Sequence, residues 1–396
     1  NDPVPLTAGV LAFFMNSGRN AIDTTHVLLH DVLALQILWN IVLILSMAAL
    51  GWLTLTIFQR NRARIFPTIW SVAAASLLPF SWFFTGYPLE YGFFNYVFVG
   101  LIIYCGLIVA LDPKANPALI ASILFVTSTL VLAIWAPLGP IPLGVACAMT
   151  IRHRRELFRS GRGFKWVFGI SALQLTVYIA LFLGPTFFAL SGTLTSPGGS
   201  IPFERNLIFV LAAVLVFLVL TTTRRVRSRE FLIVSIVVVA LLSGLAYLLY
   251  NNRALENIWT YYPLKFHGFS LMLMFALSFI FLLLLASKLT ASSAWTSIAI
   301  VVASLIGFFS LQYISSTSNG YLVENPVMKI FRGHFGSNET SDVIFNYADI
   351  AHPRILWHSG IVGEGAINLW LLKDFANLMY ADHELSHPFN VISLTG

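Results

Sequence analysis

The chain has 396 residues, of which 58% are hydrophobic and only 10% are charged, and its mean hydropathy is +0.81. These values exclude an ordinary soluble globular protein, because such proteins have about 25% charged residues. The formal net charge of +6 does not indicate nucleic-acid binding, since the basic residues cluster in short loops where anionic lipid headgroups are the usual partner. Cys105 and Cys147 both lie within apolar segments, so we expect no disulfide framework.

The first part of the chain contains a polar cluster that leads into a long apolar run. Residues 6–14 are apolar but too short to cross a bilayer, which takes about 20 residues, so we expect an interfacial helix there. Further on, NAIDTTHVLLHD contains Asp23, His26, His30 and Asp31. In a helix His26 and His30 share one face, with Asp23 close to it. This cluster predicts a general base or an anchor for a metal ion or phosphate; the alternative is a capped helix end at the membrane surface.

Ten apolar segments follow, and we expect each to form a membrane-spanning helix. An open chain has no other way to satisfy its backbone hydrogen-bonding groups in lipid. The segments cover residues 33–57, 65–84, 92–111, 117–134, 138–151, 166–190, 206–222, 231–250, 264–287 and 294–313. The fifth is short for a crossing, and Pro137, Pro140 and Pro142 beside it predict a broken or tilted helix pair.

Positive charge falls almost wholly into every second connection between these segments. The residues concerned are Arg60, Arg62, Arg64, Lys114, Arg152, Arg154, Arg155, Arg159, Arg162, Lys165, Arg224, Arg225, Arg227, Arg229 and Lys288. The connections on the opposite side have only Arg205, Arg253 and Lys265. By the positive-inside rule the first side is cytoplasmic. The sequence therefore predicts a multi-pass protein of the cytoplasmic (inner) membrane with both chain ends external.

The second external loop, FFTGYPLEYGFFNY, combines tyrosines with a carboxylate. Tyr87, Glu90 and Tyr91 lie around a short turn. A carboxylate at this mouth can hydrogen-bond a sugar hydroxyl or accept a proton. The alternative is an aromatic belt at the membrane surface with an exposed loop carboxylate.

The ninth apolar segment opens with two ionisable residues, Lys265 and His267, in TYYPLKFHGFS. Ionisable groups entering an apolar helix are costly unless they meet an anion or reach the headgroups. We expect a cationic pocket for a lipid-linked phosphate, with Arg253 as a further contact. Snorkelling of Lys265 to the interface is the alternative.

The polar composition of residues 314–396 predicts a small external α/β appendage. PRILWHSG is typical of a strand and GAINLWLLKDFANLMY of an amphipathic helix. Near the end, His383, Glu384 and His387 satisfy H-E-x-x-H, the pattern of a zinc site in which glutamate acts on bound water. This divalent metal ion is the one cofactor that the sequence suggests, and its third ligand would come from upstream, from Asp342, Asp349 or Glu364.

Three runs resemble a known family: THVLLHDVLALQILWNIVL, SVAAASLLPFSWFFTGYPLEYGFFNYVFVGLIIY and TYYPLKFHGFSLMLMF. They are similar to polytopic membrane proteins of actinobacterial cell envelopes in the GT-C superfamily of glycosyltransferases. The likeness covers roughly residues 20–110 and 255–285 and is one of pattern. It implies an enzyme that takes a sugar from a polyprenyl-phosphate donor on the external face and adds it to a glycan or glycolipid in cell-wall biogenesis. In such relatives the first external loop has the catalytic aspartate after a preceding helix; here that helix is missing, so the chain is expected to be a fragment or to lack that aspartate.

These observations predict an all-α polytopic membrane protein of about ten helices with a GT-C-like fold. It has an external segment (1–32), a transmembrane domain (33–313) and an external C-terminal region (314–396). The expected partners are a lipid-linked sugar donor, a glycan or glycolipid acceptor and membrane lipids, with membership of a larger membrane complex left open. Two alternatives remain: a membrane-tethered zinc metallopeptidase that uses the H-E-x-x-H pattern, and a non-catalytic transport or assembly subunit.

Within the enzyme hypothesis each group of residues has one role. Asp23 or Asp31 would deprotonate the acceptor hydroxyl. Lys265, His267 and Arg253 would bind the donor phosphate. The remaining residues would contact the sugar or acceptor: Tyr87, Glu90, Tyr91, His26 and His30.

Overall fold

The computed structural model describes residues 27–81, 83–84, 88, 94–112, 114–185, 204–223, 228–289, 298–307, 356–358 and 391–393. The chain divides into two compact units. One unit, here called the helix unit, comprises residues 1–4, 45–78 and 98–318; the other comprises residues 5–44, 79–97 and 319–396.

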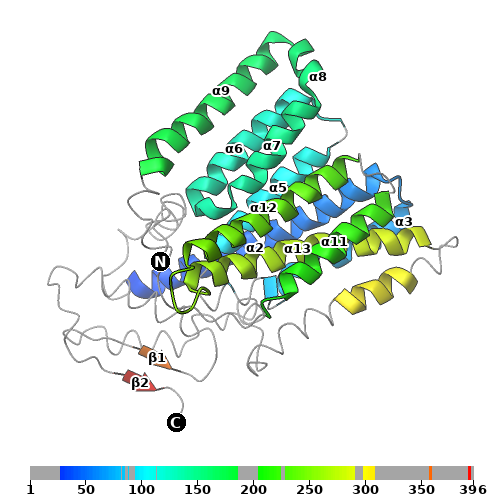
Figure 1. The fold of residues 1–396 in the computed structure, drawn as a ribbon. Coiled ribbons are helices and arrows are strands. Elements are labelled where there is room, and N and C mark those ends of the chain that lie inside the picture. Colours follow the sequence, from blue (N-terminus) through cyan, green and yellow to red (C-terminus); the bar gives the residue numbers. More distant parts are fainter. Residues whose placement is uncertain are drawn as a thin grey trace. The chain divides into compact units, whose positions relative to one another are not determined.

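Helices make up almost all of the described residues (Figure 1). They are α2 (Val27–Arg60), α3 (Ile65–Ser76), α5 (Phe94–Leu111), α6 (Pro117–Trp135), α7 (Pro140–Arg152), α8 (Arg154–Arg159), α9 (Arg162–Tyr178), α11 (Leu207–Thr223), α12 (Arg229–Asn251) and α13 (Tyr261–Leu289). Residues 298–307 are also helical. Short 3-10 turns occupy Leu78–Phe80 and Ala136–Leu138, and a π-helical turn, Ile179–Leu183, extends α9.

Five of the apolar helices are long enough to cross a membrane by length and composition. They are Asn40–Arg60, Pro117–Leu138, Arg162–Leu183, Arg229–Asn251 and Tyr261–Lys288. Five shorter apolar helices coincide with the other predicted segments: Ile65–Phe80, Asn95–Leu111, Pro140–Arg152, Leu207–Thr223 and Ile298–Gly307. The described part of the chain is consistent with a helical membrane protein, and the count of ten spans stays a prediction.

Local sequence explains where the helices begin and break. Asn116 caps α6, because its side chain accepts a hydrogen bond from the backbone N–H of Ala118 at 2.9 Å, and Ser228 caps α12 in the same way through Phe231 at 3.0 Å. Pro137 lies in the 3-10 turn that separates α6 from α7, where the N–H group that proline lacks is not needed as a hydrogen-bond donor. This turn is the break that the prolines predict.

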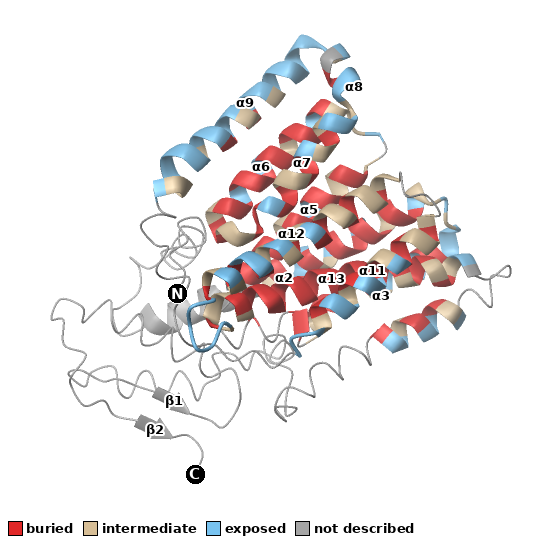
Figure 2. Ribbon diagram, viewed as in Figure 1, coloured by how far each residue is buried: buried red, intermediate tan, exposed pale blue. Residues whose placement is uncertain are grey.

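Helix α13 lies at the centre of the helix unit and packs against α3, α11 and α12. Its apolar span is 89% buried, the highest fraction of the five, and Figure 2 shows it almost wholly red. Close contacts fix its position: the Phe266 ring lies against the backbone of Gly244 in α12 and 6.1 Å from the Trp135 ring at the end of α6. Most side chains of this span are therefore surrounded by protein.

Two short strands, β1 (Leu356–His358) and β2 (Val391–Ser393), pair in parallel with Leu356 opposite Val391. β1 lies within the PRILWHSG segment. The amphipathic helix predicted after it lies outside the described residues, so the α/β appendage as a whole stays a prediction.

Candidate functional site

Lys265 lies in the second turn of α13 with 2% of its surface exposed. Its Nζ is 5.2 Å from the centre of the Trp135 ring and 5.5 Å from that of Tyr261, and it donates a long hydrogen bond of 3.5 Å to Tyr261 Oη. Ring faces attract a cation, and more strongly when water is excluded. Two aromatic rings thus help to hold a buried ammonium group at this end of α13.

His267, two residues further on, is 1% exposed and contacts different groups. Its ring meets the Trp259 ring edge to face at 5.6 Å, and the Arg205 guanidinium lies 5.3 Å from the centre of the same Trp259 ring. Neither ring nitrogen of His267 makes a hydrogen bond within the described residues.

The spacing of Lys265 and His267 places them on nearly opposite sides of α13. Successive residues turn by about 100° in a helix, so residues two apart point about 200° from each other. Their contacts agree: Trp135 and Tyr261 lie by Lys265, whereas Trp259 lies by His267. The two residues predicted as one phosphate pocket therefore lie on two faces of the central helix.

Two further buried polar side chains lie at this end of the helix unit. Trp135 Nε1 has no hydrogen-bond partner among the residues that the structure describes, nor has Asn252 Oδ1. Asn252 donates through Nδ2 to Ile258 O at 3.1 Å and to Thr260 Oγ1 at 2.7 Å, which holds the connection between α12 and α13. Because buried polar atoms are usually hydrogen-bonded, unpartnered atoms of this kind suit a polar ligand or ordered water.

Trp135 and Trp259 are the contacts that sequence reasoning missed. Trp135 ends an apolar helix, where a tryptophan is ordinary, and no sequence signal connects it with Lys265. Trp259 adjoins the Tyr261–Tyr262 pair in the same loop, so an aromatic belt near Lys265 could have been predicted.

Arg253, the third predicted phosphate contact, is exposed. Its guanidinium lies 4.0 Å from the centre of the Tyr250 ring, and Nη1 donates to Tyr250 O at 3.0 Å. These contacts cap the end of α12 and leave the side chain at the surface.

The side chains of the other predicted site residues lie outside the described part of the structure. Asp23, His26, Tyr87, Glu90, Tyr91, His383, Glu384 and His387 lie outside the described residues. His30 and Asp31 belong to α2, but the description there covers the backbone alone. Within the described residues no three His, Cys, Asp or Glu side chains are grouped so as to hold a metal ion. The metal site, the base and the sugar contacts stay predictions.

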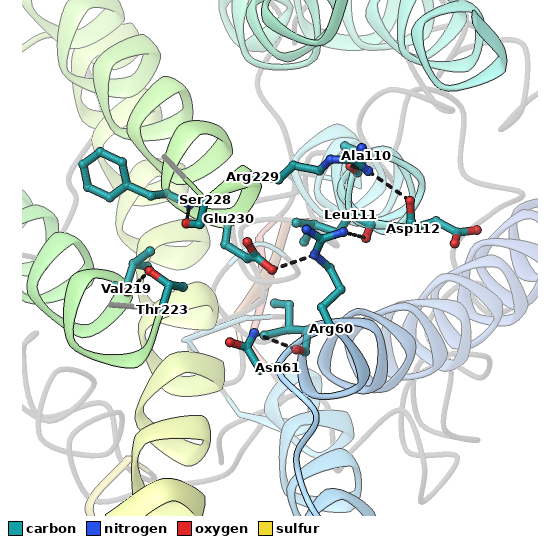
Figure 3. A network of polar contacts seen from close by, with 12 residues as sticks. Arg60, Asn61, Ala110, Leu111, Asp112, Val219, Thr223, Ser228, Arg229 and Glu230 are labelled. Atoms are coloured by element: carbon teal, nitrogen blue, oxygen red, sulfur yellow. Dashed lines mark hydrogen bonds and ion pairs between the residues drawn. The ribbon is translucent and has the colours of Figure 1, made fainter. Parts of the chain in front are cut away.

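At the other end of the helix unit from Lys265, a polar network joins the helix ends to one another (Figure 3). Arg60, the last residue of α2, donates to Glu230 Oε1 of α12 at 2.6 Å and to Leu111 O at the end of α5 at 3.2 Å. Lys288, near the end of α13, donates to Thr222 O of α11 at 2.6 Å. Cations here bind the carbonyl groups that helix C-termini leave without partners.

Arg229 extends this network to the α7–α8 turn. Its Nη1 donates to Asp112 O at 3.0 Å, and its Nη2 lies 3.2 Å from His153 Nε2. His153 Nδ1 is 3.1 Å from Glu156 Oε2. Since an arginine can only donate, His153 accepts through Nε2 and donates through Nδ1. The helix ends predicted to share the cytoplasmic side are thus joined by direct contacts.

The described helices are consistent with a helical membrane protein. Lys265 and its aromatic neighbours form a polar, aromatic-lined site at one end of the central helix, α13. No protein-family model, no curated protein and no solved structure matches the chain.

Proposed function

We propose that this protein is a membrane glycosyltransferase. It transfers a sugar from a polyprenyl-phosphate donor to a glycan or glycolipid on the external face of the cytoplasmic membrane, in cell-envelope synthesis. The observation that supports this function is the burial of Lys265 among Trp135 and Tyr261 at the start of the most buried helix. A buried ammonium group beside aromatic rings, at the start of a membrane-crossing helix, suits an anionic group such as a lipid-linked phosphate.

The proposed chemistry is an inverting transfer without a nucleotide. The acceptor oxygen forms a bond to the anomeric carbon as the bond from that carbon to the phosphate oxygen breaks. A carboxylate, Asp23 or Asp31, takes the acceptor proton, and polyprenyl phosphate leaves with the electron pair of the broken bond. Lys265 stabilises the charge that develops on that phosphate.

The separation of Lys265 from His267 divides the work between two faces of α13. Lys265 is proposed as the principal phosphate contact. His267, Trp259 and Arg205 form a second polar and aromatic group on the other face of the helix. This group suits either the part of the donor beyond its phosphate or the acceptor. Arg253, which rests on Tyr250, is proposed as a peripheral phosphate contact. Tyr87, Glu90 and Tyr91 stay the proposed sugar contacts.

The test is transfer of labelled sugar from polyprenyl-phosphate donors by membranes that contain Lys265→Met, a substitution that keeps the side-chain volume and removes the charge. We expect the transfer rate to fall by at least about 100-fold, as when a transition-state donor is removed. Arg253→Met is the matched control, because it removes a cation from an exposed position, and we expect a loss of less than about tenfold.

Thermal unfolding in detergent checks that both variants fold. A folded Lys265→Met protein that transfers sugar at the parent rate contradicts the assignment of the phosphate to Lys265. Absence of transfer by the parent protein from every polyprenyl-phosphate sugar supplied contradicts the function itself.

A further inference from the structure

Helix α9 differs from the other long helices in how little of it is covered. Only 11% of its apolar span is buried, against 39–89% for the other four, and Figure 2 shows most of it pale blue. Its buried side packs on α6: Phe168 lies 5.6 Å from Phe125, and Ser171 and Leu175 are buried. The opposite side of α9 is open.

The open side presents one continuous apolar stripe, the α9 stripe. It consists of Trp166, Ile170, Leu173, Val177 and Leu181, which are 72%, 61%, 62%, 40% and 65% exposed. Their spacing of three or four residues places them on one helix face. A stripe of this length suits the acyl chains of a lipid.

A group of cations lies at the end where the stripe begins. Five residues of α8 and the first turn of α9 form it and are here called the basic corner: Arg154, Arg155, Arg159, Arg162 and Lys165. All five are exposed, and none makes an ion pair with another described residue. The single acidic residue among them, Glu156, contacts His153 instead. The corner therefore has four surplus positive charges, the five cations less Glu156.

Stripe and corner are continuous with each other. Arg162 lies four residues before Trp166, so it stands on the same helix face as the start of the stripe. A cationic end followed by an apolar face complements an anionic headgroup followed by hydrocarbon chains. Clusters of about four to eight Lys and Arg at a membrane surface are typical of binding to anionic lipids.

We propose that the basic corner and the α9 stripe together form a binding site for an anionic phospholipid. The basic corner contacts the phosphate of the headgroup, and the stripe contacts the acyl chains. This site is separate from Lys265 and does not depend on the proposed transferase function. It makes α8 and α9 selective for anionic over zwitterionic lipid.

The experiment titrates the full chain, purified in detergent, with phosphatidylglycerol or with phosphatidylcholine of the same acyl chains, and counts bound lipid by native mass spectrometry. We expect phosphatidylglycerol to be preferred. The triple variant Arg155→Gln, Arg159→Gln, Arg162→Gln should lose that preference by at least about tenfold. The Lys-substituted triple at the same positions should retain it, because it keeps the charge.

The matched control removes three cations elsewhere on the same predicted side: Arg62→Gln, Arg64→Gln and Lys114→Gln. It should keep the preference. Equal binding of the two lipids by the parent, or an equal loss in both glutamine triples, overturns the proposal. So does a dimer that persists without lipid and dissociates on Leu173→Ser, because a second copy would then cover the stripe.

Discussion

Arg60 and Glu230 lie 170 residues apart in the chain, and Nε of the first donates to Oε1 of the second at 2.6 Å. Only 19% of the Arg60 side chain and 7% of the Glu230 side chain are exposed. Arg60 also donates to Leu111 O. This pair therefore joins the ends of α2, α5 and α12, and each charge depends on the other because little of either side chain is exposed to water.

Glu230→Gln should destabilise the protein by about 2 kcal/mol, because it leaves the largely buried Arg60 charge without its carboxylate partner. Thermal unfolding in detergent measures the effect as a lower midpoint. Glu156→Gln is the control: its side chain is 64% exposed in the contact with His153, so we expect a change within about 0.5 kcal/mol. Equal midpoints for the two variants would show that the Arg60–Glu230 pair contributes nothing measurable.

Gly244→Ala should destabilise the packing of α12 on α13 by about 1–3 kcal/mol. An added Cβ would lie 2.5 Å from Cζ of Phe266, whose ring is buried and bordered by Trp135. The thermal midpoint measures the change. Adding Phe266→Leu should restore part of the loss, because it removes the ring atoms that the new methyl group meets.

Gly169→Ala is the control for this prediction. Gly169 lies in α9, where an added Cβ has no atom within 4 Å, so we expect unchanged or raised stability, since alanine is the better helix former. If Gly244→Ala proved as stable as Gly169→Ala, the close approach of α12 and α13 would be wrong.

Sidedness can be measured with single cysteines in a protein whose Cys105 and Cys147 are replaced by serine. We expect a membrane-impermeant maleimide to label Asn257→Cys on intact cells and Arg155→Cys only after permeabilisation. The reason is the positive-inside rule, which predicts that the basic connections face the cytoplasm. Both positions are exposed, so access to reagent depends on the side of the membrane. Labelling of Arg155→Cys from outside would reverse the topology and remove the external reaction from consideration.

Lys265 and His267 lie on different faces of α13, although the sequence analysis groups them in one pocket. The sequence predicts that both residues belong to one helix, and both lie in α13. Their two-residue spacing already implied opposite faces, since a helix turns by about 100° per residue. Closeness in sequence favours a single pocket for both residues, whereas the helical period predicts two separate faces.

The sequence alone determined where helices form, because a helix satisfies its own backbone within a few residues and a run of apolar side chains marks it. Every apolar helix of the described residues overlaps a predicted segment, and the prolines mark the break after Trp135. Only the tertiary structure decided which side chains meet, such as Lys265 with Trp135 and Arg60 with Glu230. Such contacts depend on how the shapes of distant helices fit together, and no local pattern in the chain encodes that fit.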